Sequence, residues 1–348
     1  MGQRLKRILR AIARPKVFVP LALTAGLLAA LFSLADLGAA ITIMSGFKRA
    51  SLAYFLVLMI GYEVVRGVQW SYSLHELNLH VPLRKQIFAF ALSEVTKALP
   101  IGNYFQNYIL KLMGEADFSR SSVATTLIVF EEAFVCLVGV VLLGLGGWTT
   151  WARVAILAGF ALIAALVWLY RQLPYSLGEP PPRLARHQRI RKVVDAYGRF
   201  RAGAKDILHP RPIAVTLGFS AAYLSLAGLA LYIVTDGLGI PHLTVSMTMS
   251  VYFFSLALGL LIPIPVDIGV IELSGLGAFT AFGVGRNAAL SAMLVNRLLS
   301  IGASLLLAFI VVGLLYREMP ALFQRGKRRA PQPTGRTPDQ WPTHATGA

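Results

Sequence analysis

Cysteine and charge are both scarce in this chain of 348 residues. Cys136 is the only cysteine, so neither a disulfide framework nor a thiolate metal site is expected. Only 14% of the residues are charged, whereas soluble domains have roughly 25%. The six histidines are scattered without zinc-binding spacing, and there is no nucleotide-binding loop. We therefore expect no metal or nucleotide cofactor.

Long hydrophobic runs take the place of the missing charge, and apolar residues make up 56% of the chain. About 17–25 apolar residues suffice to cross a bilayer as a helix. The sequence therefore predicts an all-α polytopic membrane helix bundle, whose first span is retained because it lacks a clear cleavage site. The apolar segments lie at 17–37, 51–72, 121–147, 151–170, 212–235, 246–262, 265–283 and 287–315.

Positive charge gathers in three segments that are less apolar. Of the 33 Lys and Arg residues, six lie in 1–16, ten in 171–211 and six in 317–348. Such clusters typically flank membrane helices on the cytoplasmic side, so nucleic acid is not needed to explain the net charge of +17. The chain is thus divided into a basic cytoplasmic N-terminus (1–16), a first membrane half (17–170), a basic cytoplasmic linker (171–211), a second membrane half (212–316) and a disordered basic tail (317–348). Both termini are expected in the cytoplasm, and the protein in the cytoplasmic (inner) membrane.

The linker contains a basic amphipathic pattern at 186–208, where apolar residues recur at helical spacing among arginines and lysines. A helix of this kind can lie in the membrane interface and attract anionic lipids. It can equally be a solvated helix that covers the cytoplasmic face of the protein. Both interpretations remain open from the residues.

The number of crossings must be even if all three basic segments lie on one side, and two arrangements satisfy this condition. In one, all eight apolar segments cross and 86–112 forms an interfacial or re-entrant hairpin. In the other, 246–283 forms a hairpin that enters from outside and leaves six crossings. The two broken elements then enter from opposite faces, as inverted elements of transporters do.

Two proline-broken stretches interrupt membrane-grade sequence, and such breaks survive in a bilayer only when they are buried or line a wet cavity. The first break has Pro100 and Gly102, followed by three amides on one helical face: Asn103, Gln106 and Asn107. A helix that starts there offers free N–H groups to an anion. In the second break, Pro263 and Pro265 end one helix, Asp267 is placed like an N-cap, Gly269 allows close backbone approach, and Glu272 lies in the first turn.

Charged residues also occur inside the apolar segments, where an unpaired charge is costly. Glu63 and Arg66 share a helical face, which predicts a mutual ion pair. Glu131 and Glu132 are adjacent, so at least one must meet a cation or keep its proton. The candidate cations are Arg66, Lys97, Lys111 and Arg297. Which glutamate faces the site stays open, and ordering of the helices is the alternative role for these charges.

Taken in order, these residues resemble the lysylphosphatidylglycerol synthase transmembrane-region family of flippase-like multi-pass proteins. The resemblance covers most of residues 15–316 and rests on Arg66 with Trp70, Pro100 to Leu110, Glu131, Pro263 to Glu272, and Asn296-Arg297-Leu298. It implies transfer of a lipid between leaflets, with phospholipids, hopanoids and polyprenyl-linked sugars all conceivable.

The chain also departs from the family pattern. Asn103 and Gln106 or Asn107 replace an acid and an arginine, Glu132 replaces an arginine, and Val266 and Asp267 replace a glycine pair. The redistributed charge leaves room for a different ligand or coupling ion. No soluble aminoacyl-transfer domain is expected after Tyr316, which argues against synthesis of lysylphosphatidylglycerol.

We therefore expect a flippase-like transporter of a polar or anionic lipid rather than an enzyme. The alternatives are a membrane subunit of an envelope-lipid assembly and a membrane-embedded lipid-modifying enzyme. The expected binding residues are Arg66, Lys97, Asn103, Gln106, Asn107, Glu131, Asp267, Glu272 and Arg297, with helix breaks at Pro100, Gly102, Pro263, Pro265 and Gly269. The lipid, the energy source and the oligomeric state are left open by the sequence.

Overall fold

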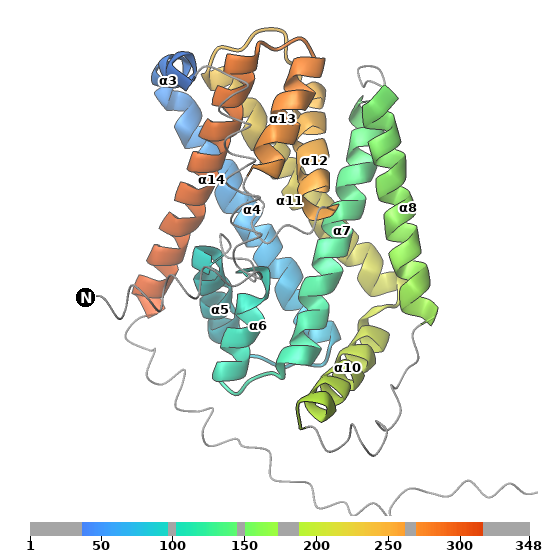
Figure 1. Cartoon of the computed structure of the whole chain (residues 1–348). Helices are drawn as coiled ribbons and strands as arrows, with labels where there is room; N and C mark the ends of the chain where they lie inside the picture. The colour runs from blue at the N-terminus through green and yellow to red at the C-terminus, as the bar shows by residue number, and fades with distance from the viewer. Residues whose placement is uncertain (1–36, 97–101, 145–149, 173–187, 262–268, 316–348) are drawn as a thin grey trace, which may run out of the picture.

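The computed structural model describes residues 37–96, 102–144, 150–172, 188–261 and 269–315. These residues form eleven helices and no strand, which confirms the predicted all-α membrane bundle. Four helices are long and apolar enough to cross a bilayer. They are α4 (Arg49–Glu76), α7 (Phe118–Gly144), α11 (Pro210–Gly237) and α14 (Arg286–Leu315), which run along the length of the bundle (Figure 1).

Four shorter helices form two half-height hairpins. α5 (Leu83–Thr96) and α6 (Gly102–Leu112) lie together in one half of the bundle, and α12 (Val245–Leu261) and α13 (Val270–Ala281) lie in the other (Figure 1). Each of these helices has 11 to 17 residues, fewer than the ~20 that a crossing needs. The two hairpins therefore enter from opposite ends of the bundle. The residues that join their arms, 97–101 and 262–268, lie outside the described part.

The short α12 and α13 match the arrangement in which 246–283 forms a hairpin rather than two crossings. A further long helix, α8 (Thr150–Gln172), runs beside α7 (Figure 1). The predicted first span at 17–37 is almost wholly outside the described residues. The short α3 (Leu37–Ser45) lies at the end of the bundle where α4 begins.

The amphipathic pattern of the linker forms α10 (Gln188–Ile207) at the other end of the bundle (Figure 1). Its last turns dock on the core, because Ala204 and Ile207 are fully or almost fully buried. Two ion pairs tie it to the start of α7: Arg199 to Asp117 at 3.2 Å and Arg120 to Asp206 at 3.1 Å. Exposed pairs contribute little stability, so apolar docking supplies most of the attachment.

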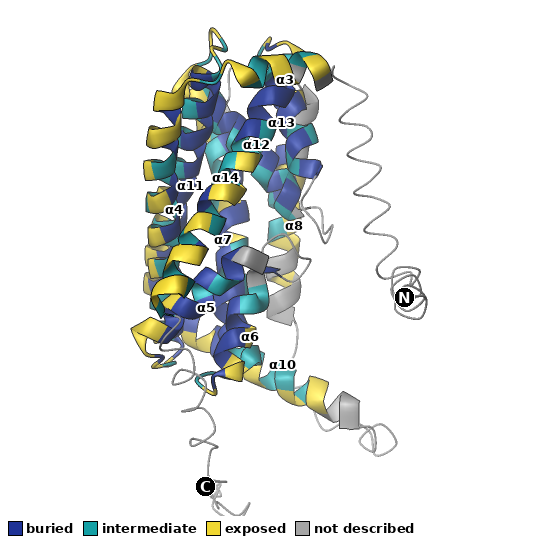
Figure 2. Ribbon diagram, turned by 90° about the vertical axis from the view of Figure 1, so that its left-hand side faces the viewer, coloured by how far each residue is buried: buried dark blue, intermediate teal, exposed yellow. Residues whose placement is uncertain are grey.

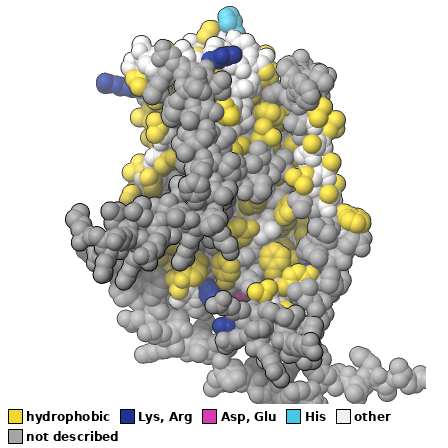
Figure 3. Space-filling view, in the orientation of Figure 1, with side chains coloured by type: hydrophobic (Ala, Val, Ile, Leu, Met, Phe, Trp, Pro, Cys, Tyr) yellow, Lys and Arg dark blue, Asp and Glu magenta, His cyan; other side chains and the backbone are white. Residues whose placement is uncertain are grey.

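Apolar side chains both fill the bundle and cover its outside. Buried residues line the interior, while exposed residues form outward stripes on α4 and α14 (Figure 2). Phe309 and Leu314 on α14 are 68% and 77% exposed, as expected for side chains that face lipid rather than water. On the face seen in Figure 3 the described side chains are mainly hydrophobic, and the visible Lys and Arg lie towards the two ends of the bundle.

Close helix approach positions the half-height hairpin α12–α13 against α7. A Cβ on Gly139 of α7 would lie 2.3 Å from the ring of Phe253 on α12, so a side chain larger than hydrogen does not fit there. Small residues commonly allow such contact between membrane helices. The hairpin is thereby held against α7 about two turns beyond Glu131 and Glu132.

Candidate functional site

A buried guanidinium links three helices near the middle of the bundle. Arg66 on α4 lies 3.4 Å (Nη1) from Glu94 Oε1 on α5 and 3.5 Å (Nε) from Glu132 Oε1 on α7. The side chains of these three residues are 12%, 4% and 8% exposed. Tyr223 on α11 donates a 2.7 Å hydrogen bond to the same Glu132 oxygen. Removing one partner of a buried ion pair leaves an uncompensated charge, so the stability of each charged residue in this cluster depends on the others.

The structure differs from the predicted ion pair between Glu63 and Arg66. The ion pairs of Arg66 run to other helices, and Glu63 instead accepts a 2.6 Å hydrogen bond from Ser304 on α14. Arg66 and Glu63 thus tie α4 to α5, α7 and α14.

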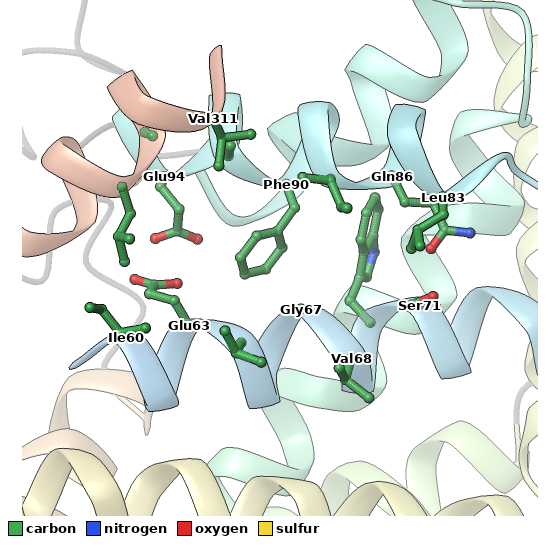
Figure 4. A pocket seen from close by; sticks show the side chains of 16 residues that line it. Ile60, Glu63, Gly67, Val68, Ser71, Leu83, Gln86, Phe90, Glu94 and Val311 are labelled. Atoms are coloured by element: carbon green, nitrogen blue, oxygen red, sulfur yellow. The ribbon is translucent and has the colours of Figure 1, made fainter. Parts of the chain in front are cut away.

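A cavity of about 370 Å³ opens beside this cluster, between α4, α5 and α14. Figure 4 shows the carboxylates of Glu63 and Glu94 turned toward each other at one end of the cavity, with Gln86 and Ser71 at the other. Its walls are otherwise apolar, and Val68 is 47% exposed at its edge. The cavity is therefore an apolar space that ends at two buried carboxylates.

Glu131 belongs to a different polar cluster from its neighbour. Its carboxylate accepts hydrogen bonds from Thr216 (2.5 Å) and Ser220 (3.5 Å) on α11 and from Gln69 (3.0 Å) on α4. None of the ion pairs found among the described residues involves Glu131, whereas Glu132 meets Arg66. Adjacent positions on α7 thus place one glutamate against a cation and the other against neutral donors.

The amides after the first break bind other helices. Gln106 and Asn107 on α6 both donate to the Thr125 hydroxyl on α7, at 3.1 and 2.8 Å. Ser93 on α5 donates to Gln106 at 3.4 Å. Asn107 Oδ1 is buried and has no hydrogen-bond partner within the described part of the chain. These amides thus hold the first hairpin together and against α7.

The second break positions an acid and a cation at the start of α13. Gly269 has φ = +96°, a conformation that strongly favours glycine, and its N–H donates a 2.6 Å hydrogen bond to Glu272. The other Glu272 oxygen lies 3.5 Å from Nε of Arg297 on α14. The Arg297 side chain is 31% exposed, so it is more accessible than that of Arg66, which is 12% exposed.

The helix cap differs from the sequence prediction. Asp267 was expected to be the N-cap, but the capping position is Gly269, and Glu272 reaches back to its N–H. The cap lies two residues later because the positive φ at Gly269 redirects the chain just before the helix begins.

Several predicted site residues fall outside what the structure describes. Lys97, Pro100, Pro263, Pro265 and Asp267 lie in undescribed segments, and only the backbone of Asn103 is described. Gly102 is the first residue of α6, as the predicted break requires. The two ion-pair groups, Arg66 and Glu272–Arg297, sit on different helices. α14 carries Arg297 and, about 10 Å further along the helix axis, Ser304, which bonds Glu63 on the same helix as Arg66.

Sequence reasoning missed the partners on α11. Thr216, Ser220 and Tyr223 recur at intervals of four and three residues, so they share one face of an otherwise apolar helix. That spacing was a usable signal for a polar seam facing Glu131 and Glu132. Across the described ranges, no group of three or more His, Cys, Asp or Glu is arranged to hold a metal ion.

Comparison with known families gives one match. The family model described as "Lysylphosphatidylglycerol synthase TM region" matches residues 17–325, which is most of the chain. The comparison with curated proteins gives no match. The matched range includes both half-height hairpins and every charged residue of the polar clusters described above.

Proposed function

The chain belongs to the lysylphosphatidylglycerol synthase transmembrane-region family, and we propose that it is a flippase-like transporter that moves a polar or anionic lipid between leaflets. The family supports a multi-pass membrane protein that handles lipid. We propose in addition that the lipid is transported without chemical change. The observation that carries it is the pair of half-height hairpins entering from opposite ends around buried ion pairs.

The hairpins support transport because helices that end at mid-height bring polar groups to the bilayer centre. An unbroken crossing helix offers no free backbone groups there, whereas a broken one ends inside the membrane. The start of α13, with Glu272 and Arg297, is one such end. At this level the headgroup would contact these polar groups in place of its hydrating water, instead of being surrounded by hydrocarbon.

Partner exchange at the arginines is the mechanism we propose for headgroup passage. The contacts of Arg66 at 3.4 and 3.5 Å and that of Arg297 at 3.5 Å are longer than the usual 2.7–2.9 Å of strong charge-assisted hydrogen bonds. A lipid phosphate can therefore replace a carboxylate as the partner of the guanidinium, since phosphate accepts bidentate bonds from arginine. Lys97 would add a third cation, and the released carboxylates would be stabilised by protons or, at Glu132, by the Tyr223 hydroxyl.

The cavity between α4, α5 and α14 is the proposed path by which lipid reaches Arg66. It ends at Glu94, which is one of the two carboxylates paired with that arginine. Its apolar walls suit an acyl chain, and the headgroup would lie toward the ion pair. Gln106 and Asn107 would then act by holding the first hairpin in place rather than by direct contact alone.

We also propose that the end of the bundle that carries α10 is cytoplasmic and that the membrane is the cytoplasmic (inner) one. Basic residues are more numerous at this end: Arg84, Lys85, Lys111, Arg120, Arg199, Arg201, Lys205 and Arg211 lie on or beside the helix ends that meet there. The opposite end has Lys48, Arg49, Arg153 and Arg286 in the described part. The positive-inside rule favours the first end as cytoplasmic, which places both termini there in a six-crossing chain.

The test is leaflet exchange in vesicles. The purified chain is reconstituted into liposomes that contain a trace of phosphatidylglycerol with a fluorophore on its acyl chain. A membrane-impermeant reductant then quenches the fluorophores in the outer leaflet. Transport predicts quenching beyond the outer-leaflet fraction, with the lipid recovered chemically intact. Arg66→Gln should slow this exchange, whereas Arg286→Gln, on the exposed start of α14, should not. A chemically altered lipid would support the enzyme alternative. Inactivity that only a partner protein relieves would support the assembly subunit, and exchange equal in all variants would overturn the site.

A further inference from the structure

A second and larger cavity lies apart from the ion pairs, between α7, α8, α10 and α11. Its volume is about 870 Å³, within the range of about 300–1,000 Å³ that small-molecule sites occupy. The transport path proposed above does not use it. Its position next to the basic amphipathic helix raises the question of what fills it in a membrane.

The wall on α7 is a single stripe that is one leaflet deep. Val123, Leu127, Phe130 and Phe134 recur at intervals of three and four residues and all line the cavity. The twelve residues of helix from Val123 to Phe134 span a rise of about 16 Å. That is about half of the roughly 30 Å hydrocarbon core, so the cavity has the depth of one leaflet.

The charge in the cavity is unequally distributed along this depth. Arg201, Lys205 and His209 line the end near α10, where Lys205 and His209 are exposed and Arg201 is 4% exposed. The deeper part has Glu131, whose oxygens are directed to Gln69, Thr216 and Ser220 on the far side. An anionic group is therefore favoured at the α10 end and disfavoured at the deep end.

We propose that this cavity binds one anionic phospholipid of the leaflet next to α10, with its phosphate at Lys205 and His209 and an acyl chain along the α7 stripe. Two features indicate this occupant. The apolar stripe on α7 is about as long as an acyl chain, and the basic side chains lie only at the interface end, where α10 meets α11. Arg201 adds a guanidinium at the inner edge of the headgroup position. The lipid would brace α10 against the bundle, because it contacts α7, α10 and α11 at once.

Lipid retention measured by native mass spectrometry tests the proposal. The full chain is stripped of lipid in mild detergent and then given equal amounts of dioleoyl phosphatidylglycerol and dioleoyl phosphatidylcholine. We expect one phosphatidylglycerol to be retained preferentially. Lys205→Gln with His209→Gln should lower that retention about fivefold or more, since each basic group near an anionic headgroup contributes that much affinity. Lys111→Gln, an exposed lysine at the same end that does not line the cavity, is the matched control.

A cavity-filling variant and a photolabel separate this site from lipid that merely surrounds the protein. Leu217→Trp should lower the retention of both lipids, because it occupies chain space rather than the headgroup position. A phosphatidylglycerol with a diazirine in its chain should label residues 127–134 more than residues 306–314, which face lipid on α14. Equal labelling of the two segments, or unchanged retention in the Lys205/His209 variant, would overturn the proposal. Equal retention of both lipids by the wild type would overturn the choice of headgroup. Since none of these readouts measures transport, they can fail or succeed independently of the proposed function.

Discussion

The Thr216 hydroxyl on α11 donates a 2.5 Å hydrogen bond to the Glu131 carboxylate on α7, and both residues are almost completely buried. This contact joins two crossing helices by a neutral donor and a carboxyl group. Glu132, one position further on, is joined to α4 by a cation instead. The two glutamates therefore make separate contributions that substitution can distinguish.

Thr216→Val removes the hydroxyl while keeping the shape of the side chain. We expect a loss of about 1–3 kcal/mol in the free energy of unfolding, because a buried carboxyl group loses one of its donors. Denaturant titration in detergent micelles measures it. Thr235→Val, whose hydroxyl bonds only to its own helix at Tyr232, is the control and should cost less. If the two variants lose the same stability, the Thr216–Glu131 bond does not join the helices as described.

Arg66→Met should destabilise the fold more than any substitution at a surface arginine. Two buried carboxylates would lose their shared cation, and breaking such a pair costs about 3–5 kcal/mol. Adding Glu132→Gln to Arg66→Met should recover part of this loss, since it removes one of the unpaired charges. A double-mutant cycle on thermal unfolding measures the coupling. Additive losses from the two substitutions would contradict the ion pair.

Gly269→Ala tests the turn into α13. The backbone at φ = +96° disfavours any side chain, so we expect a cost of about 1–3 kcal/mol and weaker closure of the Glu272 cap. Gly277→Ala is the matched control within the same helix. No atom lies within 4 Å of its added Cβ, so the change should be neutral or stabilising, as it usually is in a helix interior. Comparable unfolding midpoints for the two variants would argue against the positive φ at Gly269.

Single-cysteine labelling tests the opposed hairpins and the orientation. Cys136 is the only cysteine and is buried, so the native chain gives a low background. A cysteine at Arg286, next to the α12–α13 hairpin, should react with a membrane-impermeant maleimide from one side. A cysteine at Lys111, at the end of the α5–α6 hairpin, should react only from the other side, which we expect to be cytoplasmic. Reaction of both from the same side would contradict the six-crossing and the eight-crossing arrangements alike.

Local chemistry made a large part of the fold predictable. Apolar length predicted α4, α7, α11 and α14, and the prolines and glycines predicted the two breaks, because a membrane helix tolerates few causes of interruption. The buried charges were predictable as a set, since each is costly in hydrocarbon unless it has a partner. The family was also recognisable from the ordered motifs.

By itself, then, the sequence determined that this protein is a helical membrane bundle of one family, with two breaks and a buried charged interior. Only the tertiary structure decided that Arg66 pairs with Glu94 and Glu132 rather than with Glu63, and that Glu131 meets hydroxyl and amide donors. The reason is physical: spacing along one helix predicts which residues share a face, but partners on other helices depend on how the helices cross. The depth at which each hairpin turns is likewise a property of packing, so the opposed arrangement of α5–α6 and α12–α13 emerged only in three dimensions.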